Sequence, residues 1–528
     1  MGTNAQTFPI EFKGGLRSDM SPLQLGTQAT GAATILQNFE PDKQGGYSKL
    51  KGFAKYSTTA VPGTGPVLGL KVVTSGRVVA SRKIDAAAVS AYSSNLVSGD
   101  INKTAYYYST GTTWTYLHHG ASTNTAKGRH ASFNFDGDEK TVFVDGKNYP
   151  AVYNKNGNTM TEITGSTDAQ GASHVAVFKN TAFYAKDNNI TFTAPFTIDD
   201  FDAADGAGSL GVGFDVTGMV VFREQLIIFT TNTIKRLVGT TAADFRLEPI
   251  TEKIGCVNGD TIQEVGGDIL YLSPDGIRFL GATDRIGDFA LNVASDKIFK
   301  DAQEFISFSE NFCSVNVRSK AQYRVFAYVG SQQSSSAKGL IATKMVAQGA
   351  DGVAWATTKG IKANVADSIY TADQESIMFA NDTGFVYEME QGSSLDGEVI
   401  EAIYETPYLP ITDSQTRKTL YKSTWYIQPT GTMDIDLRLK FDFDQSTSVG
   451  VVQPKAINIA TTGSGIAIYN GGANFGGSFT FGGKLDTVYP RNLIGSFKTV
   501  AMRITDTSTN PTFTLDTAVL EFRQNDRQ

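Results

Sequence analysis

The chain has 528 residues, of which 19% are charged, 11% are aromatic and 53 are glycine. This composition excludes a disordered chain, which is charge-rich and aromatic-poor, and a coiled coil, which is built from Ala, Glu, Lys and Leu. The 46 basic and 53 acidic residues leave a net charge of −7, and no basic run exceeds two residues. The sequence therefore lacks the basic patch that a nucleic-acid-binding protein uses to grip phosphates.

The first residues contain no targeting signal. No basic segment followed by an apolar one opens the chain, and Gln6 stands where a myristoylation motif needs Ser or Thr. No apolar run approaches the roughly 18 residues that span a bilayer. We therefore expect synthesis and folding in a cytoplasm, idle sequons at Asn102, Asn189 and Asn381, and two reduced, buried thiols at Cys256 and Cys313.

Residues 1–65 form the first predicted unit, an extended arm marked by glycines.

The next unit contains a repeat of apolar run, tight turn, apolar run, tight turn and apolar run. Three stretches share this layout: 175–194, 219–239 and 262–282. Their matching positions Val177, Val221 and Glu264 are 44 and 43 residues apart, and Phe133 lies 44 residues before Val177 in a fourth stretch.

The turns of the repeat carry Asn, Asp and Gly, which tolerate the positive φ of β-hairpins. The predicted turns are Lys179-Asn180, Asn188-Asn189, Gly266-Gly267 and 273–276. About 44 residues with three or four strands is the size of one propeller blade. With weaker candidate units near 68, 106 and 376, residues 66–395 are predicted to form an all-β, irregular β-propeller of ~44-residue blades. The alternative is an array of β-sandwiches.

One helix is predicted within this unit, near residues 291–306. Ala294, Ile298, Ala302 and Phe305 recur with helical spacing, and Ser295 is a suitable N-cap. Residues 396–528 then alternate strongly, as in 433–443, and contain a glycine-rich loop around 470–484. This pattern predicts a separate antiparallel β-domain.

The residues that could support chemistry do not form a recognisable active site. The sequence GAGSLG (Gly206, Gly208, Gly211) has dinucleotide-binding spacing, but a strand-like run follows it where a helix is required. The acidic loop of Asp199, Asp200, Asp202 and Asp205 could supply oxygen ligands to calcium, but it fits no EF-hand and is expected to be a solvated turn with capping aspartates.

Other candidate groups are similarly weak. His118, His119, His130 and His174 lack the spacing of a zinc hydrolase, and the adjacent pair is expected at the surface. Paired carboxylates for glycoside hydrolysis stay open, because space rather than sequence sets their separation; Asp136, Asp138 and Glu139 form one such cluster and are expected to be solvated. We expect no catalytic, cofactor-binding or metal-binding residues and no enzymatic activity.

The order of several motifs resembles a known family. The opening segments are Gly14-Gly15, Asn38-Phe39, Gly45-Gly46 and 49–53; the middle segments are 217–231, 234–237 and 248–280; the last are 406–408 and Arg417-Lys418. Together they resemble the tail nozzle proteins (tail tubular, or packaged-DNA stabilisation, proteins) of short-tailed bacteriophages. The sequence departs from this family in its N-terminal segment, which is less arginine-rich.

This resemblance implies a structural subunit of the virion tail. The family assembles as a ring, commonly a homo-hexamer, below the portal and adaptor, contacts tail fibres or spikes, and retains the packaged DNA until ejection. The arm and the last domain would form one platform and the ring interface, with loops 199–213 and 470–484 as candidates for gating. Six copies at −7 each carry −42, so the bore would repel DNA and let it slide without specific binding.

Two alternatives from other classes stay open. One is a virion-associated propeller that binds or degrades host surface polysaccharide, which predicts an aromatic-lined cleft with two convergent acids. The other is a scaffold propeller with a peptide-binding face. Neither accounts for the two flanking segments.

Overall fold

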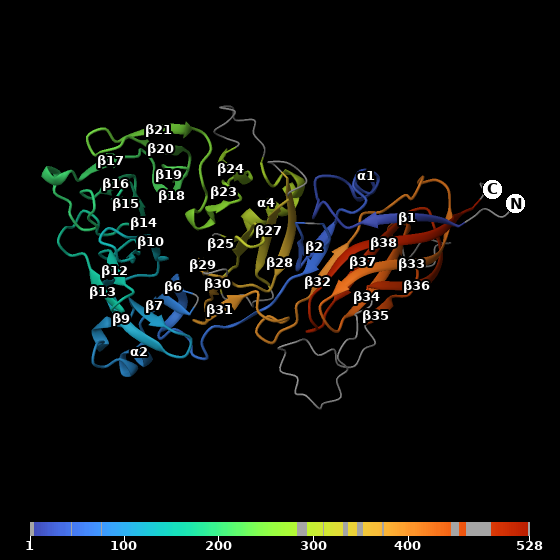
Figure 1. Ribbon diagram of the computed structural model, residues 1–528, viewed down its shortest axis with the longest axis horizontal. Helices are drawn as coiled ribbons and strands as arrows, with labels where there is room; N and C mark the ends of the chain where they lie inside the picture. The colour runs from blue at the N-terminus through green and yellow to red at the C-terminus, as the bar shows by residue number, and fades with distance from the viewer. Residues whose placement is uncertain are drawn as a thin grey trace.

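The structure is a computed structural model (Figure 1). It describes residues 5–43, 45–74, 76–281, 293–309, 311–330, 336–345, 352–371, 374–444, 453–460 and 487–525. Strands make up 51% and helices 9% of the structure, so the prediction of an all-β protein is confirmed.

Between residues 64 and 251 the chain forms four consecutive four-stranded antiparallel sheets. The first contains β6 (Thr64–Thr74), β7 (Arg77–Lys83), β8 (Lys103–Ser109) and β9 (Trp114–Thr123). The second contains β10 (Arg129–Phe133), β11 (Lys140–Val144), β12 (Ala151–Asn154) and β13 (Thr159–Glu162). The third contains β14 (His174–Phe178), β15 (Thr181–Lys186), β16 (Asn189–Phe192) and β17 (Gly208–Gly211). The fourth contains β18 (Val216–Phe222), β19 (Gln225–Thr230), β20 (Ile234–Val238) and β21 (Arg246–Thr251).

Three further strand sets follow in chain order. The fifth contains β22 (Gln263–Val265), β23 (Asp268–Ser273) and β24 (Gly276–Phe279). The sixth contains β25 (Phe312–Val317), β26 (Gln322–Ala327), β27 (Lys338–Lys344) and β28 (Val353–Lys359). The seventh contains β29 (Val365–Thr371), β30 (Gln374–Ala380), β31 (Val386–Met389) and, as its outer strand, β5 (Phe53–Lys55) from the N-terminal arm.

The first strands of these sets contact one another in chain order. β6 contacts β10, β10 contacts β14, and β14 contacts β18. The 3₁₀ turn η3 (Gly259–Thr261), which leads into β22, contacts β18 and β25; β25 contacts β29, and β29 contacts β6. Apolar side chains fill the spaces between neighbours: Val72 and Tyr107 of the first sheet share one buried cluster with Met378 of the seventh.

The hairpin turns follow the left-handed geometry that the repeat predicts. Lys179 and Asn180 have φ of 48° and 59°, and Gly266 and Gly267 have φ of 61° and 81°. The predicted turn at Asn188-Asn189 is wrong by one residue: β16 begins at Asn189, and the residue with positive φ is Asp187. Aspartate tolerates this conformation as well as asparagine does, so sequence alone did not fix the register.

The remaining strands form two sheets that we call the platform. One contains β1 (Gln6–Glu11), β3 (Phe39–Pro41), β4 (Tyr47–Lys49), β33 (Lys418–Pro429), β36 (Val488–Phe497) and β38 (Phe513–Gln524). The other contains β2 (Ile35–Gln37), β32 (Ala402–Glu405), β34 (Asp434–Phe441), β35 (Ile457–Ala460) and β37 (Val500–Asp506), and it continues into β28 through a parallel pairing of Gln37 with Thr357. In Figure 1 both chain ends lie at this side of the molecule.

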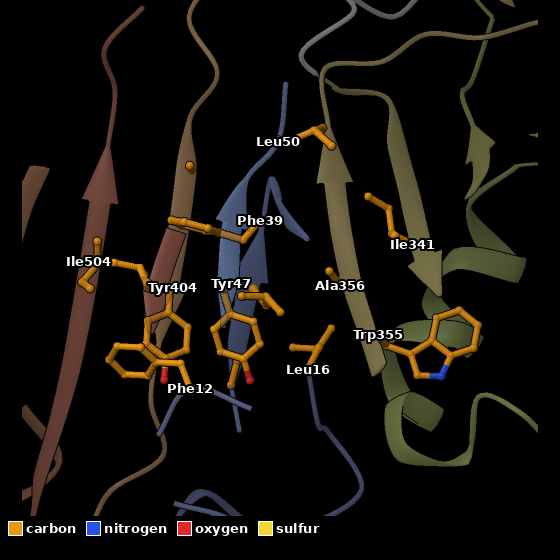
Figure 2. Close-up of a cluster of buried hydrophobic side chains, with 14 of the residues drawn as sticks. Phe12, Leu16, Phe39, Tyr47, Leu50, Ile341, Trp355, Ala356, Tyr404 and Ile504 are labelled. Atoms are coloured by element: carbon orange, nitrogen blue, oxygen red, sulfur yellow. The ribbon is translucent and has the colours of Figure 1, made fainter. Parts of the chain in front are cut away.

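Aromatic side chains from distant parts of the chain build the platform core (Figure 2). The Phe12 ring lies 5.1 Å from the Tyr404 ring and 6.0 Å from Trp425, and the Tyr47 ring lies 5.2 Å from Tyr404. All four side chains are buried. Because this core draws on both the arm and the C-terminal strands, neither segment can bury its apolar face alone.

Charged groups tie the arm in place from two sides. Lys49 Nζ lies 3.0 Å from the Asp506 carboxylate, and both side chains are fully buried. On the other side, Arg324 of β26 donates to Glu40 of β3 and to Glu390 at 3.0 and 2.6 Å. A buried charge is stable only when it is paired, so these contacts fix the arm against both of its neighbours.

The helices are short. The structure has α1 (Pro22–Gln28), α2 (Ala86–Ala91) and α4 (Phe299–Phe308), with 3₁₀ turns including η1 (Ser98–Asp100), η2 (Ala203–Asp205), η4 (Asp296–Ile298) and η7 (Asp442–Asp444). Ser295 precedes η4 but makes no cap; its hydroxyl accepts a hydrogen bond from the Ile277 amide at 3.0 Å instead. The predicted cap at Ser295 is therefore wrong. Residues 291–292 of the predicted helix and the predicted loop 470–484 lie outside the described residues.

Within the part of the chain that the structure covers, no helix is long and apolar enough to cross a membrane.

Candidate functional site

A polar cavity of about 230 Å³ lies where the first strands of the seven sets meet. Each set contributes to its wall, through Leu70, Arg129, His130, His174, Met219, Asp260, Gln263, Ser314 and Asp367 among others. We call it the axial cavity. Polar cavities of this size hold water or a small ligand.

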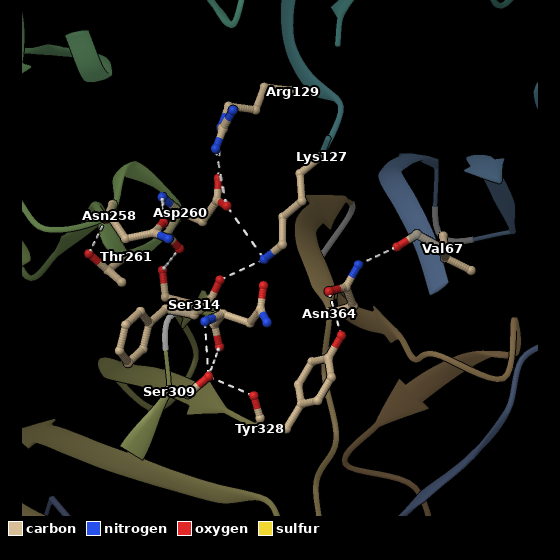
Figure 3. A network of polar contacts seen from close by, with 12 residues as sticks. Val67, Lys127, Arg129, Asn258, Asp260, Thr261, Ser309, Ser314, Tyr328 and Asn364 are labelled. Carbon is tan, nitrogen blue, oxygen red and sulfur yellow. Dashed lines mark hydrogen bonds and ion pairs between the residues drawn. The ribbon is translucent and has the colours of Figure 1, made fainter. Parts of the chain in front are cut away.

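Asp260 is the centre of the charge network in this wall (Figure 3). Its carboxylate accepts from Arg129 Nε at 2.8 Å and from Arg129 Nη2 at 3.2 Å, and Lys127 Nζ lies 3.5 Å away. Burial acts to raise the pKa of Asp260, but the Arg129 and Lys127 charges outweigh it and hold the pKa at about 2. The carboxylate is therefore ionised at neutral pH and holds the second sheet to the fifth.

Local backbone geometry positions Asp260. It lies in η3, which begins after Asn258, whose side chain accepts from the Asp260 amide at 2.8 Å. Ser314 of β25 donates to the Asp260 carbonyl at 2.7 Å, and Tyr323 donates to the Thr261 carbonyl at 2.8 Å. Strands of the sixth set thus hold η3 from the far side.

Two histidines reach the same cavity from adjacent sheets. His130 Nε2 lies 3.0 Å from the Leu70 carbonyl, and burial lowers the pKa of His130 to about 4. His174 Nδ1 lies 2.9 Å from the Ser173 hydroxyl, and the ring also interacts with the backbone of Thr217. Burial, reinforced by the Arg129 charge, lowers the pKa of His174 to about 3. Both rings are neutral at physiological pH.

A second carboxylate, that of Asp367, also lines the cavity. Asp367 accepts from the Val72 amide at 2.8 Å and lies 3.3 Å from Lys71 Nζ. Among the residues that line the cavity, the charges of Lys127 and Arg129 are balanced by those of Asp260 and Asp367.

Of the residues that line the axial cavity, His130 and His174 were candidates from the sequence, whereas the charged residues beside them were not. One signal was present: His130, His174 and Gly218 are each 44 residues apart, which is the repeat period, and all three line the cavity. Equivalent positions of a repeat that meet at one axis share a site. Lys127, Arg129 and Asp260 break the repeat and left no such signal.

The other two histidines lie elsewhere. His118 and His119 lie in strand β9 and not in a turn, and each side chain is partly exposed, at 24%. His119 Nε2 lies 3.3 Å from Asp100, and His118 Nε2 lies 3.9 Å from Glu162. The two imidazole rings stack with their centroids 6.0 Å apart.

The acidic residues considered for calcium binding or glycoside hydrolysis lie in solvated turns. Asp202 caps η2 by accepting from the Ala204 amide at 2.9 Å, and Asp200 accepts from the Asp202 amide at 3.0 Å, which confirms the predicted capping. Asp136, Asp138 and Glu139 make exposed contacts with Lys140, Asn156 and Lys155, as expected for solvated side chains. Among the described residues no three His, Cys, Asp or Glu side chains form a metal-binding group.

The last two features that the sequence analysis considered are the GAGSLG segment and the two cysteines. The glycines at 208 and 211 bound strand β17, so the GAGSLG segment opens no helix. Cys256 and Cys313 are free and buried, which confirms the predicted buried thiols, and burial raises the pKa of each to about 12.

A second cavity, of about 540 Å³, lies between the seventh sheet and the platform. The acids Asp396, Glu398 and Glu401 line it beside Phe53 and Tyr387. Both rings are buried by 91% or more. They therefore offer little exposed face on which a sugar could stack.

Comparisons with known proteins identify no family. No protein-family model and no curated protein matches the chain. Among solved structures, two crystal structures of the extracellular domain of one B. thetaiotaomicron protein, described as a one-component or a hybrid two-component system, align with 8% and 9% identity and a TM-score of 0.40. They cover 73% and 72% of this chain, which spans 44% of each of those chains. A protein of unknown function from Bacteroides thetaiotaomicron aligns with 12% identity over 64% of this chain and 72% of its own, with a TM-score of 0.31. Similarities this low carry no functional argument.

Proposed function

We propose that the seven strand sets form an irregular seven-bladed β-propeller. The support is the order of contacts between first strands, in which β29 of the last set contacts β6 of the first. The N-terminal strand β5 completes the last set, and such pairing of an early strand with a late one closes a radial array.

The function we propose is that of a structural subunit of a phage tail nozzle. In this proposal, platforms of about six copies form a ring below the portal and adaptor, and the ring retains the packaged DNA and conducts it at ejection. The sequence resemblance supports it, because the family motifs occur in order from the arm to the last domain. The chain acts without catalysis and resides in the virion tail.

One observation carries the proposal: the platform has an exposed apolar face beside a strand without a second partner. β36 pairs only with β33 within the described residues. On β36, Ile494 is 82% exposed and Val488 is 46% exposed. On the neighbouring strand β33, Tyr421 and Tyr426 are 43% and 40% exposed. Free strand edges and apolar patches on soluble proteins mark places where other chains bind. We call these four residues the β36 face.

The test is a charge placed on this face. Ile494→Lys should remove higher-order assembly of the purified chain in sedimentation velocity, because a lysine buried in an interface loses its hydration. Val97→Lys is the matched control, since Val97 is 63% exposed and lies far along the chain in the first sheet's connection. Retained assembly in Ile494→Lys, or loss in both variants, contradicts this assignment of the interface.

The alternative function, a propeller that binds or degrades polysaccharide, rests on the second cavity and its three acids. It predicts that Glu398→Gln together with Glu401→Gln abolishes retention on surface polysaccharide without changing assembly. The nozzle proposal predicts no such retention in the unmodified chain.

A further inference from the structure

We propose that His118 and Glu162 form a proton-dependent latch between the first and second sheets. The inference is independent of the nozzle proposal, because it rests on side chains within a single copy of the chain. His118 lies in β9, the last strand of the first sheet, and Glu162 ends β13, the last strand of the second sheet. These two strands contact each other (Figure 1).

The two side chains turn unused polar atoms toward each other. His118 Nε2 and Glu162 Oε1 lie 3.9 Å apart, and both atoms are buried without a hydrogen-bond partner among the described residues. This separation is beyond the reach of a hydrogen bond, and a buried polar atom without a partner is destabilising. The two side chains are 24% and 19% exposed, so protons from solvent can reach them. One proton shared between the two atoms would satisfy both.

The groups around Glu162 disfavour its charge. The negative charge of Asp145 acts on the Glu162 carboxylate, and Asp145 is itself held by the Asn148 side chain at 2.7 Å. Tyr106 lies directly opposite His118 in the β8–β9 pairing, and burial, reinforced by Asp145 and Glu162, raises the pKa of this phenol well above its ordinary value. Burial, reinforced by Asp145, also raises the pKa of Glu162 above its ordinary value of 4.5.

The groups around His118 disfavour a positive charge on its ring. His119 stacks against it, and His119 is held by the Tyr116 hydroxyl at 2.6 Å and by Asp100 at 3.3 Å. Lys103 in turn pairs with Asp100 at 2.8 Å. Burial, with a smaller effect of His119, lowers the pKa of His118 to about 4. The imidazole is therefore neutral above this pH, and its Nε2 accepts a hydrogen bond when the ring proton is on Nδ1.

An added proton is therefore most stable in a neutral pair. Taken up by Glu162, it forms an O–H group that donates to His118 Nε2 and creates no charge in the buried space. Because the pKa of Glu162 is raised, this proton stabilises the folded state fully below pH 4.5, and the contribution is lost as pH rises through the raised value. His118 takes up a proton of its own only near pH 4. The latch is thus closed between about pH 4 and the raised pKa of Glu162, and it is open at neutral pH.

The experiment is hydrogen–deuterium exchange of the full chain at pH 7 and pH 4.5, with labelling times corrected for the intrinsic pH dependence of amide exchange. We expect the amides of β9 and β13 to be about five-fold better protected at pH 4.5, which corresponds to one net hydrogen bond. β21, the last strand of the fourth sheet, is the internal reference, because it contains no histidine and its Glu248 is paired with Arg236 and Arg246. Its protection should stay the same.

Glu162→Gln removes the titrating group and keeps a donor, since its amide N–H can donate to His118 Nε2 at either pH. In this variant β9 and β13 should have the acid-level protection at both pH values. Glu248→Gln is the matched control and should keep the pH response of β9 and β13. The inference is overturned if Glu162→Gln retains the response, or if Glu248→Gln loses it as well.

The unmodified chain gives a test that needs no variant, and this test decides the question even if Glu162→Gln does not fold. A change in β9 and β13 that is no larger than the change in β21 also overturns the inference.

Discussion

A single buried ion pair holds the N-terminal arm against the C-terminal strands of the platform. Lys49 and Asp506 are fully buried, and Lys49 also donates to the Ser508 carbonyl at 3.0 Å. Breaking a buried pair from one side leaves an uncompensated charge and costs about 3–5 kcal/mol. Asp506→Asn should therefore lower the free energy of unfolding by about 3 kcal/mol in urea denaturation.

Glu521→Gln is the control for that variant, because Glu521 pairs with Lys422 at 3.4 Å with both side chains more than a third exposed. It should change the free energy of unfolding by less than about 1 kcal/mol. Equal effects of the two substitutions would show that the Lys49–Asp506 pair does not anchor the arm.

Asp260 should make stability depend on acid. Its folded-state pKa of about 2 lies below the ordinary value of 3.8, so its contribution is fully present above pH 4 and is lost as pH falls through 2. The contribution is about 2 kcal/mol by linkage. Urea denaturation at pH 5 and pH 3 should show a smaller loss in Asp260→Asn than in the unmodified chain; an identical loss would contradict the assigned ion pairs.

At the scale of elements, local patterns predicted the hairpins because turn chemistry is local. Tertiary structure can also impose on a turn a backbone conformation that its residues disfavour. Arg223 and Glu224 have φ of 47° and 59° in the turn between β18 and β19, although neither residue favours the left-handed region. The predicted cap at Ser295 is wrong for another reason: its hydroxyl accepts from the Ile277 amide of β24, a partner that no helix pattern could reveal.

The β18–β19 turn gives a direct prediction. Glu224→Gly should raise the free energy of unfolding by about 1 kcal/mol, because glycine adopts the positive φ without steric cost. Thermal or urea unfolding would measure it. Glu224→Ala is the control and should give no gain; equal gains would show that the charge at this position, and not its backbone conformation, is responsible.

At the scale of the whole molecule, composition and the repeat of short strands and turns predicted the all-β class. The sequence contains no local signal that shows which strands pair when they are far apart along the chain. Ile10 pairs with Ala518, and Phe53 pairs with Met389, yet nothing in either segment specifies the other. The axial cavity is the same case, since Lys127 and Asp260 meet only when the second and fifth sets come together.

The platform also couples to the sheets around the axial cavity. One continuous apolar cluster includes Trp355 of β28, Phe305 of α4 and Trp425 of β33. Shared burial of this kind makes the parts unfold together. The arm and the last strands therefore belong to the same cooperative unit as the sixth strand set.

The central claim is that copies of this chain form a hollow ring through their platforms. The most direct measurement is the solution mass by light scattering, with negative-stain images of the same fraction. We predict a ring of about six copies with an open centre. A trimer that is retained on bacterial surface polysaccharide would contradict the claim and favour the carbohydrate-binding alternative.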